Sequence, residues 1–421
     1  MLSQQRFSTD FDQLLTLLAA SPELLIIQDL DGVCMELVRN PLTRTLPAHY
    51  IDAARRLRPA FFVLTNGEHI GSRGVNTLVD NAYGHASHNA YLPGLAAGGV
   101  QWQDHFGSVN HPGISHQELD FLSSVPAVME QALSSILSQP PFALNTADID
   151  AARAVMVLDN PVSPTINING IHTIMNLQHE QLRELQQAVQ HTMLQLMDAA
   201  QSHGLSDSFF IHYAPNLGSD ADGERIKWAS ANDAGTTDFQ FMVKGAIKEV
   251  GVLVILNRYY HQVSGHYPLG ESFNARSAPR EREALLQLAR EHFDPAFMPR
   301  IIGVGDTVTS QANPAQSDPE HLEDHEHWLR GGSDRGFLTL VQELGRMFDS
   351  DNGVLFVDSS GGELNRPRLQ QDLLATEPWT AAEGITDSED PLQLNVVFPG
   401  GHQQYVDFFC RLARARSQSE A

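Results

Sequence analysis

The stretch Leu24-Leu-Ile-Ile-Gln-Asp-Leu-Asp-Gly-Val33 decides the fold class of this chain. Its first four residues are apolar, and two aspartates and a glycine follow them. A short apolar run bounded by turn residues is typical of a parallel strand that is buried on both faces. The aspartates would then stand at the carboxyl end of the strand, where α/β sheets bind ligands. The stretch therefore predicts a buried strand and a ligand site directly after it.

The same pattern recurs twice further along the chain, in Phe61-Phe-Val-Leu-Thr-Asn-Gly67 and in Ile301-Ile-Gly-Val-Gly-Asp306. Parallel strands present their carboxyl ends at one edge of a sheet, so the polar endings of all three stretches can converge on one site. Two more apolar runs extend the predicted sheet late in the chain, at 354–357 and 392–398. We predict an α/β fold with a Rossmann-like core built on a parallel sheet.

Residues 103–241 differ in composition from the rest of the chain, because they are richer in Gln, Asn, Ser and His. Within them, apolar residues recur at helical spacing over 182–196, which predicts a long helix with one apolar face. We predict a core domain made of residues 1–102 and 242–421. Residues 103–241 would form an inserted α+β cap domain that governs substrate specificity.

The composition excludes several classes of function. The 421 residues carry 27 Lys plus Arg against 51 Asp plus Glu, a formal net charge of −24. A surface of that charge argues against nucleic acid or an anionic membrane as partner. Cys34 and Cys410 are the only cysteines, so a disulfide scaffold is excluded and a reducing compartment is favoured. Residues 1–6 lack the order of a signal peptide, so we expect a cytoplasmic location.

Asp29 and Asp31 are the first candidates for catalysis. Residues two apart point to opposite faces of a continuing strand, but at a strand end both can face a ligand. Neighbouring carboxylates repel each other unless a divalent cation neutralises them, so the pair predicts a Mg²⁺ site. One aspartate would attack phosphorus and the other would handle the proton of the leaving group. The alternative is an Asp-Gly turn that caps a helix.

Other residues can complete a phosphate site around this pair. The Thr65 hydroxyl and the amides that follow it, from Asn66 onward, are suited to hold phosphate oxygens, and Asp306 offers the cation another carboxylate. The chain has only three lysines, and two of them, Lys244 and Lys248, stand at the predicted start of a helix. A compact ammonium group there would offset the crowded acids and bind phosphate, whereas chance is the alternative explanation of the clustering.

This ordered set of residues resembles the haloacid dehalogenase superfamily of phosphohydrolases, in its sugar-phosphate phosphatase type. The motifs of that superfamily match Asp29-Leu-Asp-Gly-Val33, a strand that ends in Thr65, a lysine at the start of a helix, and Gly305-Asp306. The superfamily favours a small residue three places after its lysine. Gly251 therefore favours Lys248, although Lys244, followed by Gly245, is the competing assignment.

The resemblance implies a role for each of these residues. Asp29 is expected to form an aspartyl-phosphate, and Asp31 is expected to act as general acid and then as general base. Thr65, Asn66 and the lysine would bind phosphate. Asp29, the backbone carbonyl of Asp31, and Asp306 would bind Mg²⁺.

Flanking stretches are similar to those of one narrower family, the phosphatases of glucosylglycerol phosphate; they are 28–36, 64–69, 92–102, 212–218 and 303–310. This similarity implies hydrolysis of 2-O-glucosylglycerol 3-phosphate to glucosylglycerol and phosphate, the last step in making a salt-tolerance osmolyte. A glucosylglycerol-phosphate synthase would be a partner. The alternatives are a phosphatase of sucrose or trehalose phosphate, or a non-catalytic partner of a sugar-phosphate synthase.

The chain departs from the superfamily after Asp306. A second acid is expected there four or five residues later, but Ser310 and Gln311 stand at those places. We interpret residues 307–333 as largely an insertion and expect Asp334, at the start of a predicted helix, to supply the displaced metal-binding acid. The alternative is that Asp334 only caps its helix.

Overall fold

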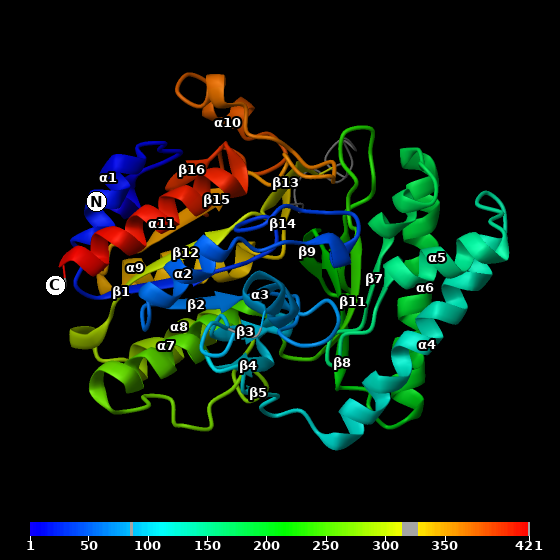
Figure 1. Ribbon diagram of the computed structural model, residues 1–421, viewed down its shortest axis with the longest axis horizontal. Coiled ribbons are helices and arrows are strands. Elements are labelled where there is room, and N and C mark those ends of the chain that lie inside the picture. The colour runs from blue at the N-terminus through cyan, green and yellow to red at the C-terminus, as the bar shows by residue number, and fades with distance from the viewer. Residues whose placement is uncertain (85–86, 314–326, 420–421) are drawn as a thin grey trace.

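The computed structural model describes residues 1–84, 87–313 and 327–419 and contains a large and a small β-sheet (Figure 1). The large sheet has eight strands, and from one edge to the other they are β16 (Val396–Phe398), β15 (Gly353–Val357), β12 (Arg300–Gly305), β1 (Leu24–Gln28), β2 (Phe61–Leu64), β3 (Gly94–Ala96), β4 (Gln101–Gln103) and β5 (Val109–Asn110). The first six strands in this order run parallel, and β4 and β5 are antiparallel to their neighbours. The predicted α/β fold with a parallel core sheet is confirmed.

Helices cover both faces of the large sheet. Alternate residues of β1 point to opposite sides of the sheet, so they show which helices lie on each face. Ile26 packs in one apolar cluster with helices α1 (Phe11–Ala19), α2 (Ala48–Arg56), α3 (Val75–Tyr83) and α11 (Gly401–Ser419). Ile27 packs in the other cluster with α7 (Lys248–Ser264), α8 (Arg282–His292) and α9 (Arg335–Phe348). The strands are therefore buried on both sides, which explains why their sequences are continuous apolar runs.

The small sheet has the order β6 (Val157–Leu158), β7 (Thr165–Asn167), β11 (Asp238–Val243) and β8 (Phe209–Ala214), and all its pairs are antiparallel. Helices α4 (His116–Ser138), α5 (Thr146–Met156) and α6 (His179–Ser202) pack against it, on the right in Figure 1. The apolar stripe predicted over 182–196 lies in α6 and faces the core. Strand β5 belongs to the large sheet and ends at Asn110, and β11 belongs to the small sheet and ends at Val243; the domain limits of 103 and 241 stay a prediction.

Two hairpins and one short helix accompany the two sheets. The hairpins are β9 (Asn216–Asp220) with β10 (Gly223–Ile226), and β13 (Thr309–Ala312) with β14 (Trp328–Gly331), and α10 (Pro378–Ala381) lies late in the chain. The second hairpin belongs to the stretch that the sequence predicted to be an insertion, of which residues 314–326 lie outside the described residues. None of the described helices has the length and apolar character needed to cross a membrane.

Candidate active site

Three strand ends bring the first site residues together. In the parallel register, Gln28 of β1 pairs with Val304 of β12 and with Val63 of β2. The residues that follow these strands, Asp29, Thr65 and Asp306, therefore emerge at the same edge of the large sheet, and all of them line one cavity. The predicted convergence of the polar strand ends is present in the structure.

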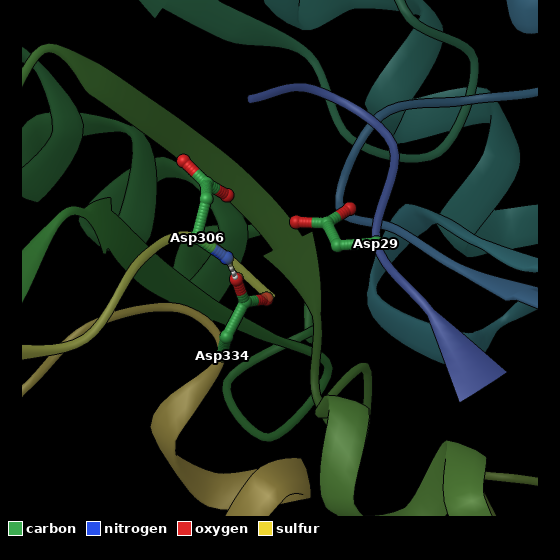
Figure 2. Close-up of side chains that lie close together, drawn as sticks. All are labelled: Asp29, Asp306 and Asp334. Atoms are coloured by element: carbon green, nitrogen blue, oxygen red, sulfur yellow. Dashed lines mark hydrogen bonds between the residues drawn. The ribbon is translucent and has the colours of Figure 1, made fainter. Parts of the chain in front are cut away.

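Asp29, Asp306 and Asp334 form a buried cluster of carboxylates (Figure 2). One oxygen from each lies within 4.8 Å of the others. The Asp334 side chain makes no capping bond to its own helix; instead its Oδ2 accepts hydrogen bonds from the backbone nitrogens of Asp306 at 2.9 Å and Thr307 at 3.0 Å. The alternative that Asp334 is only a helix cap is therefore not supported by its contacts.

Glycine is required where these carboxylates pack against backbone. A Cβ atom on Gly305 would lie 2.6 Å from Asp334 Oδ2, and one on Gly32 would overlap Asp306 Oδ2. Gly32 also has a φ of +81°, which favours glycine at this turn. The two glycines next to the aspartates in the sequence thus leave space for the cluster.

Lys248 is the cation of the cluster. It is the first residue of α7, it is 3% exposed, and its Nζ lies 2.8 Å from Asp29 Oδ2 and 2.6 Å from Asp334 Oδ1. Although burial lowers the pKa of Lys248, the charges of Asp29 and Asp334 raise it above its ordinary value. Gly251 allows α7 to approach β2 closely, because a Cβ atom there would lie 2.5 Å from Leu64 Cδ1. Lys248 therefore enters the cluster as a charged ammonium group.

Lys244 does not reach the cluster. It lies before α7, its side chain is partly exposed, and its Nζ pairs at 3.1 Å with Asp207, which is almost fully exposed. The position of Lys244 in the structure therefore does not support the competing assignment of Lys244 as the phosphate-binding lysine. The reason is that α7 begins only at Lys248, so Lys244 lies in the turn before the helix that approaches the strand ends.

The electrostatics of the cluster fit a hard divalent cation. Burial raises the pKa of Asp29 to about 7; Lys248 opposes this shift and Asp334 adds to it. The pKa of Asp306 lies well above its ordinary value, because the side chain is buried and because Asp334 and Asp29 repel its negative charge. Ser359 acts to lower this pKa. Both carboxylate oxygens of Asp306 are buried, and neither accepts a well-formed hydrogen bond from the described residues. Oxygen ligands left without partners beside two more carboxylates are what Mg²⁺ and similar cations bind.

Asp31 lies in the cavity but outside the carboxylate cluster. Arg44 holds it, with Nη1 at 3.0 and 2.9 Å from the two carboxylate oxygens. A Cβ atom on Gly67 would lie 3.8 Å from Asp31 Oδ2 and 3.7 Å from Thr65 Oγ1, so both groups face the same small space. Sequence reasoning missed Arg44, because nothing in the local sequence indicates that it returns to the strand end.

A polar face of the small sheet forms the opposite wall of the cavity. Asn167 of β7 pairs with Asp238 of β11, and Gln240, two residues on, points to the same side. Asn167 Nδ2 donates to Asp238 Oδ1 at 3.0 Å, while Gln240 Oε1 is buried without a partner among the described residues. Burial raises the pKa of Asp238 to about 6. The alternation of Asp238-Phe-Gln-Phe241 was the sequence signal for this face, and our sequence reasoning missed it.

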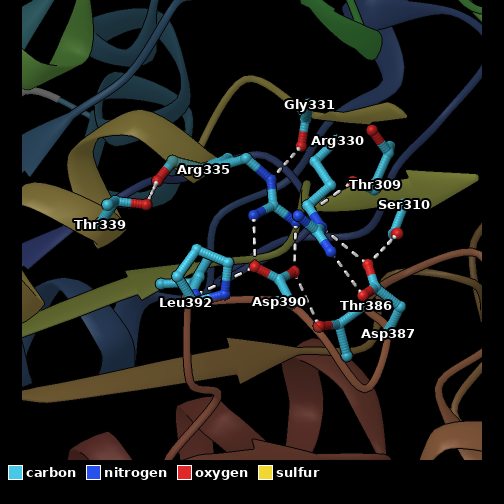
Figure 3. A network of polar contacts seen from close by, with 12 residues as sticks. Thr309, Ser310, Arg330, Gly331, Arg335, Thr339, Thr386, Asp387, Asp390 and Leu392 are labelled. Atoms are coloured by element: carbon cyan, nitrogen blue, oxygen red, sulfur yellow. Dashed lines mark hydrogen bonds and ion pairs between the residues drawn. The ribbon is translucent and has the colours of Figure 1, made fainter. Parts of the chain in front are cut away.

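Paired arginines and acids fix the segment that carries Asp334 (Figure 3). Arg335, the next residue, binds both carboxylate oxygens of Asp390 at 2.8 and 2.7 Å. Arg330 of β14 binds Asp387 in the same two-pronged way, at 2.8 and 2.7 Å. Both acids are buried, so the segment on either side of Gly332 is tied to residues 386–392. This network was not predicted, because its acids lie more than fifty residues along the chain.

The parallel core sheet and the four motifs gathered at its edge define the class as a phosphohydrolase of the haloacid dehalogenase type. The chain belongs to the glucosylglycerol-phosphate phosphatase family, whose sequence model matches residues 23–413. It is 49% identical to a protein of Synechocystis sp. named glucosylglycerol-phosphate phosphatase, over 99% of this chain and 98% of that one. The family resemblance expected from the sequence is confirmed.

Solved structures with a related outline include the C-terminal domain of trehalose-6-phosphate phosphatase from C. albicans, at 10% identity and a TM-score of 0.47, covering 97% of this chain and 99% of that chain. Trehalose-6-phosphate phosphatase from Aspergillus fumigatus matches at 9% identity and a TM-score of 0.39, with the same coverage.

Proposed function

We propose that this protein hydrolyses 2-O-glucosylglycerol 3-phosphate to glucosylglycerol and inorganic phosphate. The chemistry is carried by one observation: the carboxylate of Asp29 stands in a cavity, within 4.8 Å of two further acids and 2.8 Å from Lys248. The substrate follows from membership of the family. The product is an osmolyte, so we place the reaction last in osmolyte synthesis, in the cytoplasm, after a glucosylglycerol-phosphate synthase.

In the proposed reaction, a carboxylate oxygen of Asp29 attacks phosphorus and the bond from phosphorus to the glyceryl oxygen breaks. Asp31 gives its proton to that oxygen, so glucosylglycerol leaves with its carbon–oxygen bond intact. Asp31 then takes a proton from water, which attacks the aspartyl-phosphate and releases phosphate. Arg44 holds both carboxylate oxygens of Asp31 and so orients the side chain in its ionised form.

Asp29, Asp306 and Asp334, with the backbone carbonyl of Asp31, would hold Mg²⁺, which supplies charge neutralisation for the incoming phosphate. Thr65 and Asn66 lie at the cavity wall and are placed to bind phosphate oxygens. Lys248 offsets the negative charge of the acids and phosphate together.

We further propose that the small sheet and its helices are the cap domain, and that its polar face binds the hydroxyl groups of the substrate. The support is chemical: Asp238 and Asn167 offer acceptors and donors, and Gln240 Oε1 has no hydrogen-bond donor among the residues that the structure describes, so it can accept from a polyol. An apolar wall would not distinguish a sugar phosphate from other phosphate esters.

The test is phosphate release from glucosylglycerol phosphate, sucrose phosphate and trehalose phosphate, with Mg²⁺ and after its chelation. We expect turnover of the first substrate, loss of turnover on chelation, and recovery when Mg²⁺ is restored. Asp29→Asn should abolish activity while the protein stays folded, because an amide is too poor a nucleophile. Preference for another sugar phosphate would reassign the substrate, and an active Asp29→Asn variant would refute the mechanism.

A further inference from the structure

The stretch His212-Tyr-Ala-Pro-Asn-Leu-Gly218 has no part in the roles assigned above, yet it crosses from β8 to β9 beside the active site. The side chains of His212 and Asn216 are among those in this stretch that are buried. Glu224 of β10 lies between them. Together these three residues, which we call the cap relay, form an unbroken path of hydrogen bonds from one catalytic loop to another.

At its first end, the cap relay contacts the predicted phosphate loop. Asn66 Nδ2 lies 2.8 Å from His212 Nε2, and His212 Nδ1 lies 2.8 Å from Glu224 Oε1. Because an amide nitrogen can only donate, His212 Nε2 accepts and the ring carries its proton on Nδ1, which donates to the carboxylate. Asn66, the neighbour of Thr65, is thus held by a histidine whose tautomer is fixed by Glu224.

At its other end, the cap relay contacts the loop before Asp334. Glu224 Oε2 accepts from Asn216 Nδ2 at 2.9 Å, and Asn216 Oδ1 accepts from the backbone nitrogen of Gly332 at 3.1 Å. The fit is close, because a Cβ atom on Gly331 would lie 2.4 Å from Asn216 Oδ1. A second bond, from Thr309 Oγ1 to the Asn216 carbonyl at 2.7 Å, ties the same turn to the start of β13.

The path therefore joins two loops that are far apart in the sequence. Asn66 follows the strand that ends in the phosphate site, and Gly332 lies two residues before Asp334 of the carboxylate cluster. Each of the three relay residues comes from the proposed cap, whereas both ends of the path lie in the core. The β8–β10 part of the cap therefore contacts both the phosphate-binding side and the metal-binding side of the site.

We propose that His212, Glu224 and Asn216 are positioning residues that couple these two loops, so that both take their active geometry only when the cap is docked. In largely buried surroundings each bond of the path helps to fix the orientation of the next group. Glu224 also accepts from the backbone nitrogen of Tyr213, and Asn216 Oδ1 also accepts from that of Gly218, so loss of one bond loosens the path while the fold of the β8–β10 segment is kept. The role in catalysis rests on the proposed function, but the coupling between the loops does not.

The first test measures amide hydrogen exchange in the full-length protein with Mg²⁺, which requires no turnover. His212→Phe keeps a ring of similar size and removes both of its hydrogen bonds. We expect exchange to rise about 3- to 30-fold in peptides covering 65–69 and also in those covering 329–334, which His212 does not touch. His212→Gln, with an amide that both donates and accepts, should restore part of the protection.

The control for this test is Gln190→Ala. Gln190 lies on α6 and contacts Tyr213 within the small sheet, at 3.4 Å, and is not part of the path. Exchange in both loops should remain at the wild-type level in this variant. A rise in His212→Phe that is confined to the 65–69 peptides, or no rise, would overturn the proposal.

The second test measures phosphate release. His212→Phe and Asn216→Ala should each lower kcat about 3- to 30-fold, with less effect on KM, and the double variant should be no slower than the slower single variant, since one path is broken once. Multiplying losses would mean two independent roles and would overturn the coupling. If the wild-type protein hydrolyses no sugar phosphate, the proposed function fails and hydrogen exchange alone decides the coupling.

Discussion

Replacing Lys248 by methionine tests the centre of the site most directly. The ammonium group makes two hydrogen bonds to buried carboxylates, at 2.8 Å to Asp29 and 2.6 Å to Asp334, and hydrogen bonds to charged groups contribute about 1.5–3 kcal/mol each. Its removal also removes a positive charge that lowers the pKa of Asp29, so the protonated form of the nucleophile is favoured. Both effects weaken attack on phosphorus.

We expect kcat/KM of Lys248→Met to fall about 10²- to 10³-fold, which corresponds to about 2.7–4 kcal/mol of transition-state stabilisation, as for other electrostatic groups in dry sites. The assay is phosphate release from glucosylglycerol phosphate in saturating Mg²⁺. Thermal unfolding is measured in the same buffer, since an unpaired buried acid can cost about 3–5 kcal/mol of stability. The rate is then referred to the folded fraction.

Lys244→Met is the matched control. Lys244 pairs on the surface with Asp207, and exposed ion pairs contribute only about 0–1 kcal/mol, so activity should stay within about twofold of wild type. The reasoning is refuted if Lys248→Met keeps a third or more of wild-type activity when folded. It is equally refuted if the two variants lose activity to the same extent.

Three further outcomes are expected. Asp31→Asn should slow turnover and let a phosphoenzyme accumulate, because no base activates water; intact mass after an acid quench should detect the added phosphate, and its absence would remove the general-base role. Asp334→Asn should raise the Mg²⁺ concentration for half-maximal activity, since the amide keeps an acceptor for two backbone nitrogens but loses the charge, and an unchanged titration would contradict its role as a ligand. Arg335→Met should lower the free energy of unfolding by about 3–5 kcal/mol in urea, because Asp390 is left buried without its ion-pair partner, whereas the exposed Arg282→Met should change it by less than about 1 kcal/mol.

The sequence predicted the core sheet well, because its signals are local. Each of the apolar runs that became β1, β2 and β12 is short, continuous and followed by turn residues, and that pattern reports burial on both faces. Parallel pairing then requires the residues after these strands to share one edge. The domain limits of 103 and 241 rest on a shift in composition and stay a prediction; in the structure β5 belongs to the large sheet up to Asn110 and β11 to the small sheet up to Val243.

What the sequence by itself determined is therefore the α/β class, the family, and the chemical groups available. These are two aspartates at one strand end, a hydroxyl at another, the further acids Asp306 and Asp334, and two lysines, of which Gly251 favoured Lys248. Only the tertiary structure decided which groups meet. In the structure Lys248, and not Lys244, contacts the acids. Asp334 accepts a hydrogen bond from the backbone of Asp306, although a hairpin separates them in the chain, and Arg44 pairs with Asp31. The physical reason is that strand and helix signals act over a few residues, whereas a buried ion pair depends on how whole elements pack, and chain spacing says little about that packing.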